Sequence, residues 1–407
     1  MYCYSLGCYF LNTIALNPLF LLNSLHEKSF MKIAIVCYPT FGGSGVVATE
    51  LGLELAHRGH EIHFITYRQP VRLALLNPNV HYHEVNVPEY PLFHYQPYEL
   101  ALSSKLVDMV KLYKIELLHV HYAIPHAYAG YMAKQMLKEE GISLPMVTTL
   151  HGTDITLVGN HPVYKPAVSF SINKSDVVTS VSQSLKDDTN KLFTINKEIV
   201  VIPNFIELDK NRNETSISCH RSIMAKPEER IVTHISNFRK VKRIPDVIKI
   251  FNKIQQSIPA KLMMVGDGPE KEKAEKLCDE LGIQDKVIFF GNSNEIDKIL
   301  SYSDLFLLPS ETESFGLAAL EAMAWSVPVV SSNSGGLPEV NFDGISGFLS
   351  NVGDIDDMAI KALTILRDTT ALDTFKKNAL TVAEQFDIKN ILPLYEELYE
   401  KAITQTV

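Results

Sequence analysis

Short apolar runs alternate with helical patterns along the chain from residue 31 onward. Near-continuous apolar strands separated by helices are typical of a parallel sheet that is covered on both faces. The runs are also rich in β-branched residues, which favour strands. In the first half of the chain this pattern predicts strands over residues 33–37, 61–67, 80–85, 117–121, 146–150, 177–181 and 199–202.

A second alternating series follows a turn at Pro203 and a polar stretch over residues 209–218, which is typical of a domain boundary. The predicted fold class is therefore α/β, with two doubly wound, Rossmann-like domains (residues 31–205 and 206–385) facing a central cleft. Such sheets bind ligands at the carboxyl ends of their strands. The pattern over residues 386–407 predicts a last helix that can cross back to the first domain. The second series predicts strands over residues 231–235, 261–265, 286–290, 305–308 and 328–331.

Composition narrows the class of protein. A chain of 407 residues with 46% apolar and 21% charged residues has material for two globular cores. The formal net charge of -9 argues against general nucleic-acid binding, and no dense Lys/Arg run predicts docking on an anionic membrane. Five scattered cysteines without a C-x-x-C pair favour a reducing cytoplasm and give no zinc or redox motif.

Residues 1–30 are apolar and aromatic, but asparagine, proline and serine interrupt them and no basic segment precedes them. A signal peptide or a membrane span is therefore poorly supported. Because Met31 and Lys32 open a clean strand pattern, we expect residues 1–30 to be a disordered or non-native extension and translation to begin at Met31.

The most informative motif is E-x7-E, formed by Glu313 in the loop after strand 305–308 and Glu321 on the helix that follows. Ser314 and Gly316 lie in this loop, and the free N–H groups at the start of the helix can bind an anion. The two carboxylates can accept hydrogen bonds from the hydroxyls of a sugar and a ribose joined to that phosphate. With the rest of the chain the motif predicts a nucleotide sugar, although an isolated E-x7-E is explained better by a helix-dipole carboxylate and a solvated glutamate.

Loops of the first half offer further candidates. Gly43 and Ser44 lie in a glycine-rich turn between a predicted strand and a helix, where backbone can approach a ligand closely. His119 and His121 end one strand and point to the same side of it, so at least one of them can be a packed core residue. His151 ends another strand and is followed by glycine, so it can hydrogen-bond a sugar hydroxyl or help to place an acceptor.

The second half supplies a basic loop, which contains Asn237, Arg239, Lys242 and Arg243 in an otherwise acidic chain. A diphosphate leaving group needs such cations, because each charge-assisted hydrogen bond contributes about 1.5 to 3 kcal/mol. Two more strand-to-helix loops can shape a nucleotide pocket and read the edge of the base. Their candidate residues are Gly266, Asp267, Phe290 and Gly291.

Over residues 31–405 the chain resembles the family 4 retaining glycosyltransferases of the GT-B fold. The family likeness rests on E-S-F-G-L-A-A-L-E from Glu313, on the glycine-rich turn, on V-G-D-G-P from Val265 and on Lys242. Four longer strings resemble family members that transfer N-acetylglucosamine from UDP-GlcNAc to the hydroxyl of L-malate, the first step of bacillithiol biosynthesis. These are C-Y-P-T-F-G-G-S-G, H-V-H-Y-A-I-P-H-A, T-T-L-H-G-T-D-I-T and H-I-S-N-F-R-K-V-K-R.

The resemblance implies a role for each donor-side residue. Glu321 would bind the ribose hydroxyls, Glu313 the sugar hydroxyls, and Lys242 the diphosphate, while Phe315 to Leu317 would offer backbone N–H groups. Many family members have an arginine where this chain has Asn237, so we expect Arg239 or Arg243 to supply that charge. The implied reaction is front-face displacement with retention, which needs no enzyme nucleophile, no cofactor and no metal.

The first domain would then bind the acceptor. L-malate carries two carboxylates, so its site should contain anion donors, with Gly43, Ser44, Arg72, Tyr122 and Thr153 as candidates. His151 would lie between acceptor and sugar and would join Glu313 and Lys242 as the residues closest to the chemistry.

Two other enzyme functions remain open at this point, together with a non-catalytic nucleotide-binding module. One is a family 4 transferase acting on a glycan or a lipid-linked acceptor, and the other is a UDP-sugar epimerase of similar fold. The predicted partners are small molecules only, without nucleic acid or stable membrane association. The sequence leaves the oligomeric state open, a homodimer included.

Overall fold

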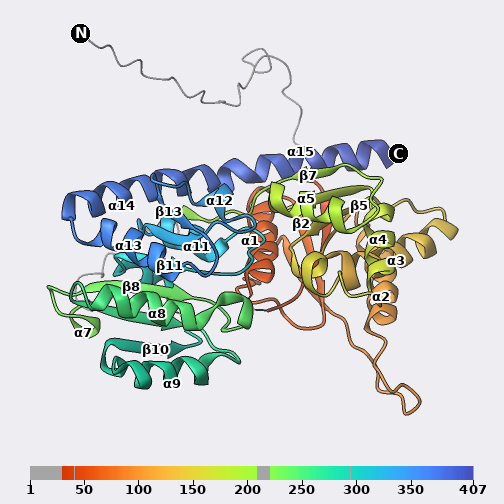
Figure 1. The fold of residues 1–407 in the computed structure, drawn as a ribbon. Coiled ribbons are helices and arrows are strands. Elements are labelled where there is room, and N and C mark those ends of the chain that lie inside the picture. The colour runs from red at the N-terminus through yellow and green to blue at the C-terminus, as the bar shows by residue number, and fades with distance from the viewer. Residues whose placement is uncertain (1–29, 41, 209–220, 294, 407) are drawn as a thin grey trace, which may run out of the picture. The chain divides into compact units, whose positions relative to one another are not determined.

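The structure is a computed structural model that describes residues 30–40, 42–208, 221–293 and 295–406. The polar boundary stretch and all but the last residue of the expected N-terminal extension lie outside these described ranges. The fold class predicted from the sequence is confirmed, because the chain forms two parallel sheets with helices on both faces of each (Figure 1). Both sheets belong to one compact unit, Met31–Val407.

The first sheet has seven strands in the order β3-β2-β1-β4-β5-β6-β7. Its strands pair in parallel throughout, and the order reverses direction between β1 and β4, as in a doubly wound fold. The strands are β1 (Lys32–Val36), β2 (Glu61–Thr66), β3 (Val80–Glu84), β4 (Leu117–His121), β5 (Met146–Leu150), β6 (Val177–Ser180) and β7 (Ile199–Val201).

Alternating side chains of β1 divide the core of this half into two layers. Ile33 and Ile35 pack with α1 (Gly43–His57), whereas Ala34 and Val36 pack with α2 (Tyr98–Tyr113) and α3 (Tyr128–Glu139). Two further helices, α4 (Lys165–Lys174) and α5 (Gln183–Leu192), and two single helical turns, η2 (Ala123–Ala127) and η3 (Thr153–Leu157), complete this half.

The second sheet has six parallel strands in the order β10-β9-β8-β11-β12-β13. The strands are β8 (Arg230–Ile235), β9 (Ala260–Val265), β10 (Val287–Gly291), β11 (Leu305–Leu308), β12 (Val329–Ser332) and β13 (Gly347–Ser350). Helices α8 (Ile244–Gln255) and α13 (Ile355–Leu366) pack on one face, and α11 (Leu317–Ala324) and α14 (Thr369–Ala383) on the other. The remaining elements are α7 (Arg221–Met224), η5 (Lys240–Lys242), α9 (Lys271–Leu281), η6 (Gln284–Lys286), α10 (Ile296–Ser301), α12 (Leu337–Val340) and η7 (Glu384–Phe386).

Every strand predicted from the sequence is present, with ends that differ by no more than one residue. Strand β13 was not predicted, because G-F-L-S contains a glycine and no β-branched residue. Among the described residues, no helix combines the length and the apolar character that crossing a bilayer requires.

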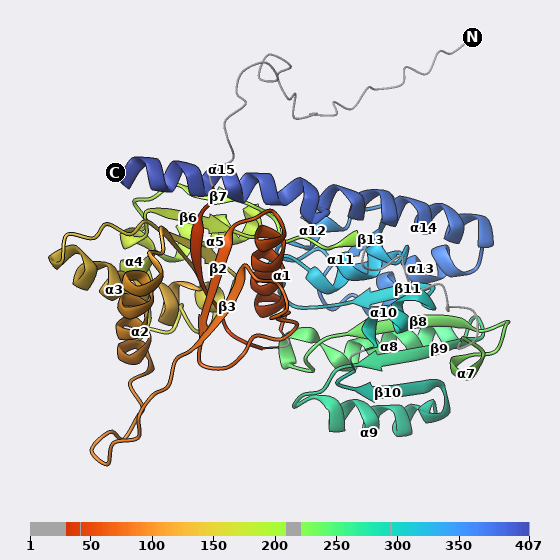
Figure 2. The same cartoon turned by 180° about the vertical axis from the view of Figure 1, so that it is seen from behind.

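The last helix, α15 (Ile388–Thr406), belongs to the core of the first half. Figures 1 and 2 show it as the dark blue helix that continues from α14 and runs along the seven-stranded half. Its buried side chains recur at helical spacing, and Leu392, Tyr395 and Tyr399 pack with Ile33 and Ile35 of β1. The chain therefore leaves the second half and ends on the first.

Helix α15 also forms a hydrogen bond with a histidine of β4. The hydroxyl of Tyr399 lies 2.7 Å from Nδ1 of His119, and Nε2 of His119 lies 2.8 Å from the hydroxyl oxygen of Thr149 on β5. His119 is fully buried, and burial together with the nearby His151 lowers its pKa to about 3. His119 is thus a neutral core residue with both ring nitrogens paired.

Candidate functional site

Loops from both halves meet at residues 313–317, just before α11. A Cβ atom built on Gly152 would lie 1.6 Å from Oγ of Ser314. Only glycine therefore allows the turn at residues 151–154, the H-G-T-D turn, to approach Ser314 this closely. The hydroxyl of Ser182, before α5, donates to the carbonyl of Ser314 at 2.5 Å. A Cβ on Gly43 would lie 3.1 Å from Cδ2 of Leu317, which places the glycine-rich turn against the first residue of α11.

A further link between the halves involves Glu339 on α12. Its carboxylate accepts hydrogen bonds from the backbone N–H groups of Gln183 and Ser184, both at 2.8 Å. It thereby caps the start of α5 from the opposite half. Ser182 and Glu339 were not among the candidate site residues, although Glu339 ends the string G-G-L-P-E after a predicted strand, which is typical of a turn.

Lys242 and Glu313 form an ion pair at the centre of this region. Nζ of Lys242 lies 2.5 Å from Oε1 of Glu313, and the hydroxyl of Ser310 donates to the same oxygen at 2.8 Å. Both charged side chains are largely shielded from solvent, with 19% and 13% of their surfaces exposed. The backbone N–H of Glu311 donates to the carbonyl of Val241 at 2.7 Å, which fixes the basic loop to the E-x7-E loop. An anion arriving here would therefore compete with Glu313 for the ammonium group of Lys242.

Several backbone N–H groups precede the first hydrogen bond within α11. Gly316 precedes the helix, and the first backbone bonds to its carbonyl come from the N–H groups of Ala319 and Leu320. The preceding amides, those of Phe315 to Leu317 among them, come before the first hydrogen bond within the helix. Phe315 itself is buried, and its ring contacts that of Phe386.

The arginines of the basic loop differ in their surroundings. Nε of Arg243 lies 2.5 Å from Oδ2 of Asp246 in the first turn of α8, so its charge is already engaged. Arg239 is exposed, and its charge acts on the hydroxyl of Tyr122 in the other half, opposing the increase in pKa that burial causes there. Asn237 is exposed, and its carbonyl accepts from the N–H of Arg239 at 2.5 Å.

The V-G-D-G-P loop contacts the basic loop through backbone atoms. A Cβ on Gly266 would lie 1.8 Å from the carbonyl oxygen of Ser236, so the two loops are in direct backbone contact. The N–H of Phe238 donates to the carbonyl of Asp267 at 3.0 Å, and the N–H of Gly266 donates to that of Gly291 at 2.8 Å. Phe290 is half-buried at the edge of the core beside them. These glycines set the position of the cations.

On the first half, Ser44 and Tyr122 form a hydroxyl pair with their oxygens 2.7 Å apart. The Tyr122 ring lies 5.0 Å from that of Tyr38 and 5.1 Å from that of His151, centroid to centroid. Tyr38, Tyr122 and Thr153 line a cavity of about 460 Å³. Tyr38 was missed by the sequence analysis, since a single tyrosine after a strand carries no signal of its own.

The His151 turn is held by a buried carboxylate. Asp154 accepts from the N–H groups of Ala123 and Gly152 at 2.9 Å and from that of His151 at 3.2 Å. Nε2 of His151 lies 2.8 Å from Nδ1 of His121. Burial lowers the pKa of His151 to about 3 and that of His121 well below its ordinary value. Both rings are therefore neutral at pH 7, and His151 can position a hydroxyl but brings no positive charge.

Arg72 lies in a cluster of acidic groups from both halves. Its Nη1 is 2.8 Å from Oε1 of Glu50 on α1, and its charge also acts on Glu321 of α11 and Asp297 of α10. Asp297 accepts from the indole N–H of Trp325 at 3.1 Å. The structure thus pairs Arg72 with Glu50, and the charge of Arg72 acts on Glu321, the residue expected to hold the ribose.

Burial raises the pKa of Glu321 to about 7; Arg72 opposes the shift, and Glu50 and Asp297 add to it. Folding therefore favours the protonated carboxyl group, and the folded state loses stability as pH rises from about 4.5 to about 7. We predict that Glu321→Gln raises the free energy of unfolding by about 1–3 kcal/mol above pH 7 and has no effect near pH 4.

Urea unfolding curves at pH 4, 6 and 8 measure this effect. Glu311→Gln, at an exposed position in the loop before α11, is the matched control and should change stability little at any of the three pH values. An equal effect of Glu321→Gln at pH 4 and pH 8 would contradict the assigned cause.

Comparison with known proteins agrees with this geometry. Residues 41–210 match the model for Glycosyltransferase Family 4, and residues 219–382 match that for Glycosyl transferases group 1. The N-acetyl-alpha-D-glucosaminyl L-malate synthase of Bacillus anthracis is 46% identical over 370 residues, covering 91% of this chain and 96% of that protein. An uncharacterised glycosyltransferase of Methanocaldococcus jannaschii is 28% identical, covering 92% of this chain and 99% of its own length.

Solved structures share the fold at low identity. Sucrose-phosphate synthase from Thermosynechococcus elongatus superposes with a TM-score of 0.76 at 20% identity, covering 92% of this chain and all of that one. Anabaena HepE, in complex with UDP and glucose, gives a TM-score of 0.74 at 21% identity, covering 91% of this chain and 99% of its own. Both halves thus match family models and a relative 46% identical spans nearly the whole chain, so this protein belongs to the family 4 glycosyltransferases of the GT-B fold.

Proposed function

We propose that this enzyme transfers N-acetylglucosamine from UDP-GlcNAc to the hydroxyl of L-malate with retention of the anomeric configuration, as the first step of bacillithiol biosynthesis. The observation that carries the proposal is the junction at residues 313–317, where a Lys–Glu ion pair and a helix start meet the H-G-T-D and glycine-rich turns of the other half. The name of the 46% identical Bacillus anthracis relative supports the choice of donor and acceptor.

The donor would bind across the second half. Glu321 would accept hydrogen bonds from the ribose hydroxyls, and the sugar hydroxyls would bind Glu313. The diphosphate would draw Lys242 away from Glu313, with the amides of Phe315 to Leu317 close to its charge. Lys242 would then exchange the Glu313 carboxylate for the diphosphate, and Glu313 would become available for the sugar hydroxyls.

In the transfer step, the malate hydroxyl oxygen would form a bond to the anomeric carbon while the bond from that carbon to the diphosphate oxygen breaks. Attack comes from the face that UDP leaves, and the hydroxyl proton would pass to the departing phosphate oxygen. The charge that develops on this phosphate is stabilised by Lys242 and the amides before α11. We expect no metal ion and no cofactor in this step.

Malate would bind on the side of Ser44, Tyr122 and Thr153. Its carboxylates need cations, and the neutral His151 provides none. Arg72 is already paired with Glu50, and Arg243 with Asp246. Arg239 is exposed and acts on Tyr122, so we propose that it supplies the positive charge expected near Asn237 and faces the malate carboxylates as well as the diphosphate.

The function is tested by incubating the purified protein with UDP-GlcNAc, with and without L-malate, and measuring UDP release. We predict release only when malate is present, and a fall in kcat of about 10²–10³-fold in Lys242→Ala. Lys240→Ala is the matched control, because Lys240 is exposed on the same turn, and it should retain wild-type turnover. UDP release or sugar isomerisation without malate would instead support an epimerase, and transfer only to a glycan or lipid would support the other acceptor class.

A second test separates the acceptor side from the donor side. We predict that Arg239→Ala raises the KM for malate about 10–100-fold, the loss expected for one charge-assisted hydrogen bond, and raises that for UDP-GlcNAc less. Ser44→Ala should raise the KM for malate and leave that for UDP-GlcNAc unchanged, because it removes the partner of Tyr122. Unchanged malate kinetics in both variants would remove these residues from the acceptor site.

A further inference from the structure

Four ionisable side chains gather on one face of the outer strands β2 and β3, away from the region described above. Glu61 and His63 are two residues apart on β2 and so point to the same face. Parallel pairing sets His63 beside His81, and His83 follows two residues later on β3. Tyr113 of α2 covers this face, with ring centroids 4.7 Å from His63 and 4.9 Å from His83.

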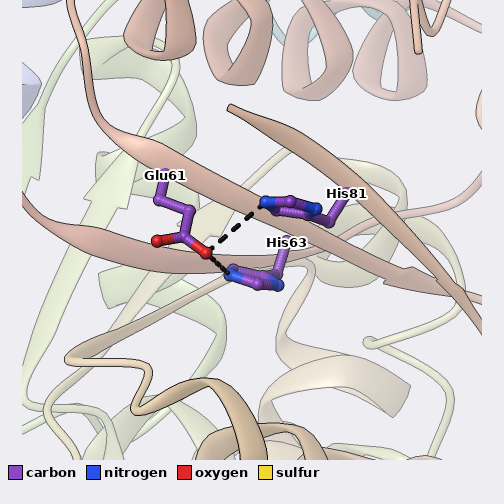
Figure 3. Close-up of side chains that lie close together, drawn as sticks. All are labelled: Glu61, His63 and His81. Atoms are coloured by element: carbon purple, nitrogen blue, oxygen red, sulfur yellow. Dashed lines mark hydrogen bonds and ion pairs between the residues drawn. The ribbon is translucent and has the colours of Figure 1, made fainter. Parts of the chain in front are cut away.

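Two of the imidazoles point a nitrogen at the same carboxylate oxygen (Figure 3). Nε2 of His63 lies 3.1 Å from Oε1 of Glu61, and Nε2 of His81 lies 3.4 Å from that atom. All three ligand atoms fall within 4.8 Å of one another. Tetrahedral zinc with bonds of about 2.0–2.1 Å separates its ligand atoms by about 3.3 Å. Two of the three separations are therefore already close to that value.

His83 and Lys32 orient the side chains that would bind the metal. Nδ1 of His63 lies 2.9 Å from Nε2 of His83, so His63 can donate a proton there and keep the lone pair of Nε2 for a metal. The second carboxylate oxygen of Glu61 is 2.9 Å from Nζ of Lys32, which orients the group.

We propose that Glu61, His63 and His81 bind a zinc ion that fastens the edge strand β3 to β2. Two imidazole nitrogens and one carboxylate oxygen are a donor set typical of zinc. The side chains of Glu61 and His81 are 30% and 36% exposed, so water can reach the site and supply the fourth ligand. Glu61 and Lys32 begin their strands, whereas the transfer site lies at the carboxyl ends of the same sheet. The ion is therefore structural and takes no part in the transfer.

The test uses the full chain without a histidine tag, stripped with a chelator and titrated with zinc chloride by calorimetry. We expect about one equivalent bound with a Kd in the micromolar range or tighter, and a rise in the thermal midpoint on zinc addition, because the ion binds the folded state. Cobalt(II) in place of zinc should give the strong visible absorption of a tetrahedral site. A wild-type protein that binds no zinc under these conditions would overturn the proposal.

His81→Gln and Glu61→Gln should each weaken zinc binding at least about tenfold and abolish the thermal shift. His94→Gln, at an exposed histidine in the loop before α2, is the matched control and should bind zinc as the wild type does. Unchanged wild-type affinity for UDP in all three variants would show that they are folded. Zinc binding that survives both ligand substitutions would place the ion elsewhere and contradict the assignment.

Discussion

The contact between the Ser314 loop and the first half is the constraint on which the site depends. The H-G-T-D turn reaches Ser314 only because residue 152 lacks a side chain, and Ser182 holds the same loop through its carbonyl. The loop that carries Glu313 is thus fixed from both halves. Each parallel sheet ends its strands at this junction, so residues far apart in the sequence share one small region. Helix α15 stabilises the arrangement by returning the chain to the first half.

Charge is arranged around this contact in two separate groups. Lys242 and Glu313 neutralise each other, so the largely shielded pair carries no net charge before a ligand arrives. In the second group Arg72 pairs with Glu50 and opposes the raised pKa of Glu321, whereas Glu50 and Asp297 add to the increase that burial causes. A ligand that offers hydroxyls to Glu321 and an anion to Lys242 would match the first group by replacing Glu313 and the second by donating hydrogen bonds to its carboxylates. This is the electrostatic pattern that a nucleotide sugar presents.

The fold and its junction were largely predictable from the sequence, because strand periodicity and strand-to-helix loops are local signals. The E-x7-E loop, Lys242 and the H-G-T-D turn each carry a recognisable local string. The partners of these residues depend on packing between distant elements, and no local pattern encodes them. Arg72 was grouped with the acceptor residues from its loop position, and the structure adds that its guanidinium pairs with Glu50 and that its charge acts on Glu321. The ion pair between Arg243 and Asp246 likewise emerges only from the structure.

The histidines also show that the sequence predicts which side chains share a strand face but not their partners on other elements. His119 and His121 share one face of β4, as period-two spacing predicts, but only the structure shows that Tyr399 of α15 pairs with His119. The E-x-H and H-x-H strings on β2 and β3 become a cluster only through strand pairing.

A crystal structure of the protein with UDP tests the central claim most directly. The account predicts that the ribose hydroxyls contact Glu321, and that the diphosphate contacts Lys242 and the amides before α11, with the Lys242–Glu313 pair opened. A nucleotide bound away from Glu321 and Lys242, with that ion pair intact, would contradict it.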